Sequence, residues 1–125
     1  MSANPWCHLD APTLTELDLA SVLVREVVGT PYLVGSCLTT PVYRDVDIRV
    51  ILTDDRYRQL FRIDAPHADP LRHLIEDALT RHYVDATGLR IDFQIQQMTD
   101  ANIRYPGPSG RHPLGIFPWP TKEDQ

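Results

Sequence analysis

Hydrophobic and polar side chains alternate regularly in two segments, residues 45–52 and 89–96. Their hydrophobic positions are Val46, Ile48, Val50 and Leu52 in the first segment and Leu89, Ile91, Phe93 and Ile95 in the second. Successive side chains of a β-strand point to opposite faces, so each segment is predicted to be a strand with one apolar and one polar face. A short β-prone segment at 32–34 predicts a third strand.

Helical spacing of hydrophobic residues predicts a first helix over residues 14–28. Thr13 is the expected N-cap and Glu16 its capping-box partner. Pro5 and Pro12 are interpreted as helix breakers, so residues 1–12 are predicted to form an N-terminal arm.

A second long helix is predicted after Asp69, the expected N-cap, with Pro70 in its first turn and its end near Gly88. Shorter helices are expected over 54–61 and 99–104. Residues 105–125 are rich in proline and are predicted to form an irregular C-terminal strap, anchored through Phe117 or Trp119.

This order of elements predicts one α/β (α+β) domain spanning residues 1–125. We expect a small mixed sheet with helices on one face and an open, polar cleft on the other. The composition, 42% hydrophobic and 23% charged, is that of an ordinary globular protein. Two cysteines, no long apolar run and no signal-peptide pattern favour a cytoplasmic protein without a membrane partner.

The net charge of −5 argues against direct electrostatic binding of nucleic acid, but acidic clusters can recruit cations. Asp45 and Asp47 are two residues apart on one predicted strand, so their carboxylates share a face. Asp92 lies on the polar face of the other well-patterned strand. If the strands are neighbours, the three carboxylates converge as ligands for Mg²⁺ or Mn²⁺.

Gly35 and Ser36 follow the first predicted strand directly. Glycine allows close approach of the backbone to an anion, and a serine hydroxyl with turn N–H groups can bind terminal phosphates. A Gly-Ser turn followed by a strand that carries Asp-x-Asp is therefore typical of a metal–nucleotide site.

Tyr32-Leu33-Val34-Gly35-Ser36, followed after eight residues by Asp45-Val46-Asp47-Ile48, resembles the signature of the DNA polymerase β-like nucleotidyltransferases. The segment Leu89-Arg90-Ile91-Asp92-Phe93 is similar to the strand that carries their third carboxylate. The resemblance covers about residues 14–97 and is that of a minimal family member.

The resemblance implies transfer of a nucleoside monophosphate from a nucleoside triphosphate, such as ATP, to an acceptor, with release of pyrophosphate. It makes Asp45, Asp47 and Asp92 the metal-binding catalytic residues and Gly35 and Ser36 the phosphate-binding residues. No basic residue follows Ser36 until Arg44, so Arg44 and Arg49 are the expected substitutes. The acceptor could be a protein, a tRNA or DNA end, or a small molecule.

Several alternatives stay open. Arg49 could instead pair with a carboxylate, Asp64 could be the third metal ligand, and Cys37 could be a reactive thiol rather than a small buried residue. The fold could also serve as a non-catalytic nucleotide- or partner-binding module, or as a metal-dependent phosphoesterase. Whether the chain works as a homo-oligomer or with a partner protein is equally open.

Overall fold

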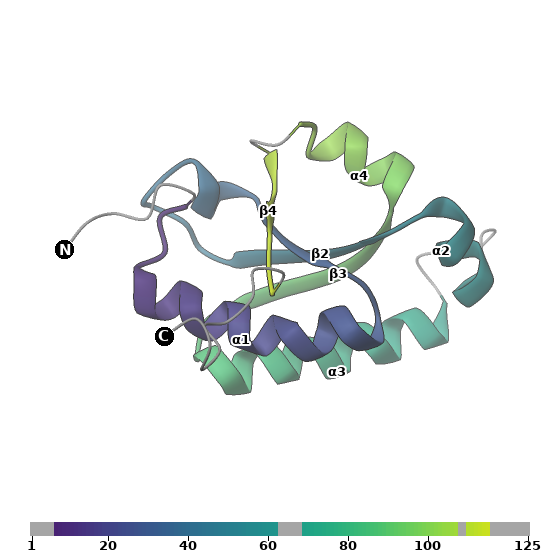
Figure 1. Cartoon of the computed structure of the whole chain (residues 1–125), viewed down its shortest axis with the longest axis horizontal. Helices are drawn as coiled ribbons and strands as arrows, with labels where there is room; N and C mark the ends of the chain where they lie inside the picture. Colours follow the sequence, from purple (N-terminus) through teal and green to yellow (C-terminus); the bar gives the residue numbers. More distant parts are fainter. Residues whose placement is uncertain (1–6, 63–68, 108–109, 116–125) are drawn as a thin grey trace, which may run out of the picture.

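The computed structural model describes residues 7–62, 69–107 and 110–115, and these form a mixed α+β fold around a four-stranded sheet (Figure 1). The strands lie in the order β3 (Ile91–Gln97), β2 (Val46–Leu52), β1 (Pro31–Val34) and β4 (His112–Pro113). β2 and β3 are parallel, whereas β1 is antiparallel to both of its neighbours. The predicted α/β class with a mixed sheet is therefore confirmed.

Helices α1 (Ala11–Val27) and α3 (Pro70–Thr87) lie side by side on one face of the sheet (Figure 1). The apolar faces of β2 and β3 pack against them, as their alternating sequences predict. Ser21 and Tyr83 join the two helices through a buried hydrogen bond of 2.8 Å between their hydroxyls. This layer forms the main hydrophobic core.

Helix α1 begins three residues earlier than predicted. Asp10 is its N-cap, and the Asp10 carboxylate accepts the backbone N–H of Thr13 at 2.8 Å. Pro12 lies in the first turn, where a missing N–H leaves no helical hydrogen bond unmade. The predicted capping box at Thr13 was therefore wrong, and residues 11 and 12 of the predicted arm belong to the helix; residues 1–6 lie outside the described residues.

The other helices agree closely with their predicted positions. Helix α2 (Asp54–Leu60) is capped by Thr53, and α4 (Met98–Arg104) follows β3 directly. The N-cap of α3 is Asp69, as predicted, and Gly88 ends the helix with a left-handed φ of 71°.

The second face of the sheet is only partly open. Helix α4 lies on the side opposite α1 and α3 (Figure 1) and contacts β2 and β3. Ile51 and Gln96, on this polar side of their strands, are buried to 6% and 9% exposure. The open part is therefore confined to the beginnings of β2 and β3, where Asp47 and Asp92 lie, rather than extending over the whole face.

The C-terminal strap contributes a short strand that the sequence did not predict. In β4, His112 and Pro113 pair with Leu33 and Tyr32 of β1. Leu114 is completely buried, and its N–H donates to the Pro31 carbonyl at 2.9 Å. The predicted anchors Phe117 and Trp119 lie outside the described residues.

Helix α3 also covers the outer edge of the sheet. The carboxylate of Glu76 accepts the backbone N–H of Ile95 in β3 at 2.8 Å. Arg72, one turn earlier, donates to the same carboxylate oxygen at 3.0 Å and so holds it in place.

Among the described residues, no helix has the length and apolar character required to cross a membrane.

Candidate functional site

The parallel pairing of β2 and β3 brings two of the predicted carboxylates together. Asp47 and Asp92 are register partners on adjacent strands, and neighbouring strands are about 4.8 Å apart. Asp45 lies just before β2, on the same side as Asp47. The structure therefore brings together the three aspartates that the sequence singled out, while Asp64 lies outside the described residues.

Asp47 is the central carboxylate of this group and the most perturbed electrostatically. Burial raises its pKa above the ordinary value for aspartate, and the nearby charges of Asp92 and Asp45 raise it further, whereas Arg49 opposes them. In the described part of the chain, no basic or backbone group donates a hydrogen bond to the Asp47 carboxylate. The Asp47 carboxylate instead faces two other carboxylates, and a side-chain hydrogen bond with Asp92 also raises its pKa. This environment favours a cation.

The Gly-Ser turn contacts Asp47 directly. Gly35 ends β1 with a φ of 82°, and a β-carbon at this position would overlap the Oδ2 atom of Asp47. Residues Ser36–Leu38 then form a short 3₁₀ turn, in which Ser36 is exposed. The predicted phosphate-binding turn and the predicted metal ligand thus lie in contact.

Cys37, in the same turn, is completely buried, and burial raises the pKa of its thiol to about 12. A thiol with so high a pKa is almost entirely protonated near neutral pH, and the thiolate is the reactive form. The structure thus favours a small buried residue over a reactive thiol.

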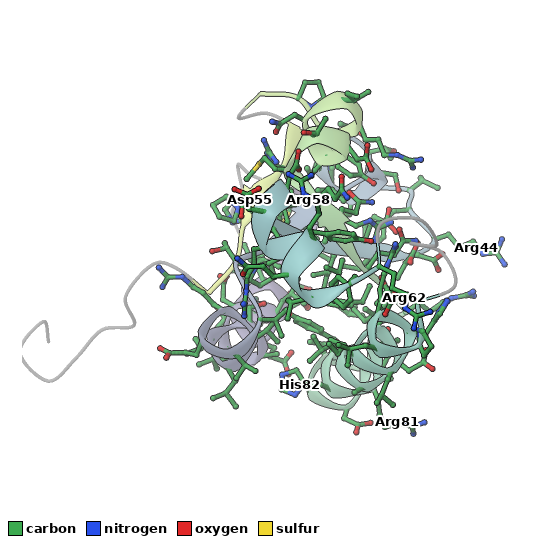
Figure 2. All side chains as sticks on the ribbon, turned by 90° about the vertical axis from the view of Figure 1, so that its right-hand side faces the viewer. Arg44, Asp55, Arg58, Arg62, Arg81 and His82 are labelled. Atoms are coloured by element: carbon green, nitrogen blue, oxygen red, sulfur yellow. The ribbon has the colours of Figure 1, made fainter. Side chains whose placement is uncertain are left out.

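Arg49 is buried to 5% exposure, although the sequence suggested that it binds phosphate. Its Nη1 donates to the carbonyl oxygens of Ile48 at 3.0 Å and Asp92 at 2.7 Å, and its Nη2 lies 3.4 Å from Asp92 Oδ2. Pairing with a carboxylate, the alternative that the sequence left open, is the arrangement found. Arg44 is exposed and extends away from the domain into solvent (Figure 2).

Two further residues that were not among the predicted site residues join the site. Arg90 Nε pairs with Asp45 Oδ1 at 3.2 Å on the surface. Gln94 donates from Nε2 to Asp92 Oδ1 at 3.4 Å, so both carboxylate oxygens of Asp92 have a partner. The signal for Gln94 was present in the sequence, because residues two apart on a strand share a face.

The donor set suits a hard divalent cation at Asp45 and Asp47, since carboxylate oxygens are its preferred ligands. Over the described ranges, no three acidic, histidine or cysteine side chains already enclose a metal position. Asp45 and Asp92 carry arginine partners instead, and Asp47 is the carboxylate without one.

The chain was compared with models of protein families, with curated proteins and with solved structures. None of the three comparisons gives a match.

Proposed function

We propose that this domain is a metal-dependent nucleotidyltransferase that transfers a nucleoside monophosphate from a nucleoside triphosphate to an acceptor. The observation that supports it most is the contact between Gly35 and Asp47, with Asp92 in register beside Asp47. A turn suited to phosphate and a cluster of carboxylates suited to a cation therefore meet at one place on the sheet.

In this proposal Asp45 and Asp47 hold Mg²⁺ or Mn²⁺, which would neutralise the charge of the phosphates and of the transition state. The Gly35-Ser36 turn receives the terminal phosphates through its backbone and the exposed hydroxyl of Ser36. Arg44, exposed near Asp45, can add positive charge to a bound triphosphate. These residues position the triphosphate with its α-phosphorus near Asp92.

In this proposal Asp92 is the carboxylate that activates the acceptor hydroxyl. The acceptor oxygen forms the new bond to the α-phosphorus and gives up its proton to the Asp92 carboxylate. The bond between the α-phosphorus and the oxygen that bridges it to the β-phosphorus breaks, and pyrophosphate leaves. The acceptor is a protein hydroxyl, a nucleic-acid end or a small molecule.

The test is incubation with α-labelled nucleoside triphosphates and Mn²⁺, followed by assays for pyrophosphate and for labelled product. We expect both from the wild-type protein, and a loss of at least a hundredfold in Asp47→Asn, which removes a charged ligand but keeps the shape. Asp85→Asn, an exposed acid on α3, is the matched control and should keep full activity. Equal activity of the two variants would contradict the proposal.

A second candidate function is supported by the pairing of Arg49 with Asp92. The Asp92 carboxylate already has Arg49 as its partner rather than an acceptor hydroxyl, an arrangement that favours a fold that binds a nucleotide without transferring it. Binding of a labelled triphosphate without turnover would favour this module, and hydrolysis alone would indicate a phosphoesterase.

For either function we expect the protein to be located in the cytoplasm. Both cysteines are free, as is usual in a reducing compartment.

A further inference from the structure

Arg49 is a buried charge in the middle of the site. It lies on the same face of β2 as Asp47, and its side chain is 6% exposed. A buried guanidinium is costly unless it is paired and hydrogen-bonded. The chain retains it beside the carboxylates that we assign to metal binding, so it calls for a role there.

The guanidinium is fixed in position by the backbone. Its Nη1 is shared by two carbonyl oxygens, one from β2 and one from β3, at 3.0 and 2.7 Å. Moving Arg49 out toward a ligand would break both hydrogen bonds and leave two carbonyls without this donor. Arginine also keeps its positive charge at all physiological pH values. Arg49 is therefore a permanent cation at a fixed place.

The partner of that cation is Asp92. One carboxylate oxygen of Asp92 faces Arg49 Nη2 at 3.4 Å and the other faces Gln94 Nε2 at 3.4 Å. Asp47, its register partner, has no such donor among the described residues. Within that part of the chain, the carboxylate left without a cationic partner is therefore Asp47, and the pair of its neighbour Asp45 with Arg90 is exposed to solvent and weak.

We propose that Arg49 serves as the counter-ion of Asp92 in place of a second metal ion, so that the site binds one divalent cation per chain. This inference rests on the proposed function. Two-metal sites place two ions about 3.5–4 Å apart on shared carboxylates. Here a guanidinium nitrogen already lies 3.4 Å from Oδ2 of Asp92, one of the oxygens that a second ion would need.

The experiment counts bound Mn²⁺ from the electron paramagnetic resonance signal of the free ion, with the full chain and no nucleotide. We expect one ion per chain for the wild-type protein and two for Arg49→Met, because Asp92 is then without its counter-ion. Arg90→Met is the matched control: it removes an arginine from the exposed pair with Asp45 and should leave the count at one.

The double variant Arg49→Met with Asp92→Asn removes the buried charge together with its partner. Replacing a buried pair by neutral groups is often tolerated, so this variant also carries the test if Arg49→Met does not fold. We expect it to bind one ion, with an affinity within about threefold of wild type. Loss of that ion, or binding more than tenfold weaker, would make Asp92 a metal ligand and overturn the inference.

The remaining outcomes separate this inference from the proposed function. Two ions in the wild-type protein would overturn the role of Arg49 and leave the metal site standing, as would one ion with unchanged affinity in Arg49→Met. Binding of no ion by the wild-type protein would remove the metal site, and the inference with it.

Discussion

The carboxylate of Asp47 fills the space in which a β-carbon on residue 35 would stand, and glycine is the residue that leaves this space empty. Gly35→Ala should therefore displace Asp47 and also strain the backbone, which has a positive φ here. We expect a loss of roughly 2–4 kcal/mol in the free energy of unfolding, measured with urea.

Gly88→Ala is the control for a left-handed φ alone, because Gly88 has a ψ of 5°, whereas the ψ of −159° at Gly35 belongs to a region that is nearly restricted to glycine. Gly88 has a similar φ of 71°, but no atom lies within 4 Å of a β-carbon at this position. A loss of about 1–2 kcal/mol is expected. Equal losses in the two variants would show that neither the contact with Asp47 nor the unusual ψ of Gly35 adds to the cost.

Asp47→Asn and Asp92→Asn make the same chemical change on adjacent strands and should have opposite effects on stability. Burial raises the pKa of Asp47 in the native state, so ionisation of Asp47 disfavours folding. In metal-free buffer near pH 7, Asp47→Asn should be at least as stable as wild type. Asp92→Asn leaves the guanidinium of Arg49 unpaired and should cost roughly 1–3 kcal/mol.

The effect of Asp47 on the free energy of unfolding also depends on pH. Below the ordinary pKa of aspartate the carboxyl is protonated in both the folded and the unfolded protein, so it carries no penalty. As the pH rises through the raised native pKa, wild type should lose stability relative to Asp47→Asn, and the difference should then become constant. Urea unfolding between about pH 3 and 8 checks this, and a difference of the opposite sign would make Asp47 a stabilising residue.

Mn²⁺ should raise the melting temperature of the wild-type protein because it binds the folded state. At a concentration of about 100 times Kd the gain is about 2.7 kcal/mol, which corresponds to several degrees in a domain of this size. Asp47→Asn should lose most of that gain, and Asp85→Asn should keep it. A melting temperature that does not change with millimolar Mn²⁺ would indicate a solvated acidic surface instead of a metal site.

Cys37 should react very slowly with alkylating reagents in the folded protein. It is completely buried, and burial raises the pKa of its thiol to about 12, so almost no thiolate is present at pH 8. Mass spectrometry of iodoacetamide-treated protein should find Cys37 unmodified in native buffer and fully modified in concentrated urea. Rapid labelling of the native protein would show that the 3₁₀ turn opens readily.

Leu114 tests whether the C-terminal strap belongs to the core. Its side chain is completely buried although it follows a strand of only two residues. Leu114→Ala should lower the free energy of unfolding by roughly 2–5 kcal/mol. Leu23→Ala, at an exposed site on α1, should change it by less than about 0.5 kcal/mol.

The elements with regular patterns could be predicted from the sequence, because residues near one another in the chain determine them. The alternation in β2 and β3, and Asp69 and Gly88 at the ends of α3, are of this kind. At α1 two overlapping caps competed. Thr13 has the capping-box partner, but Asp10 is the N-cap of the helix, and Pro12 lies in the first turn. β4 was missed because two residues carry no periodicity, and pairing with β1 determines its place.

The candidate site also has a part that the sequence predicts and a part that depends on the assembled fold. The aspartates and the Gly-Ser turn were identified from type and spacing, but their convergence depends on the parallel pairing of β2 with β3. The partner of Arg49 could not be chosen from the sequence, because a strand position specifies a face but not whether a long side chain turns toward solvent or toward a neighbour. Its burial follows from the packing of the assembled sheet.

Both outer margins of the sheet are unsuited to recruiting another strand. On the β3 side the Ile95 N–H, which an incoming chain would need, is already bonded to Glu76. On the β4 side the last strand has two residues, and Pro113 has no N–H to offer. Exposed edge strands are the usual sites at which other chains pair and aggregation begins. Within the described residues, an added strand would therefore find a backbone N–H already bonded on one side and a proline without an N–H on the other.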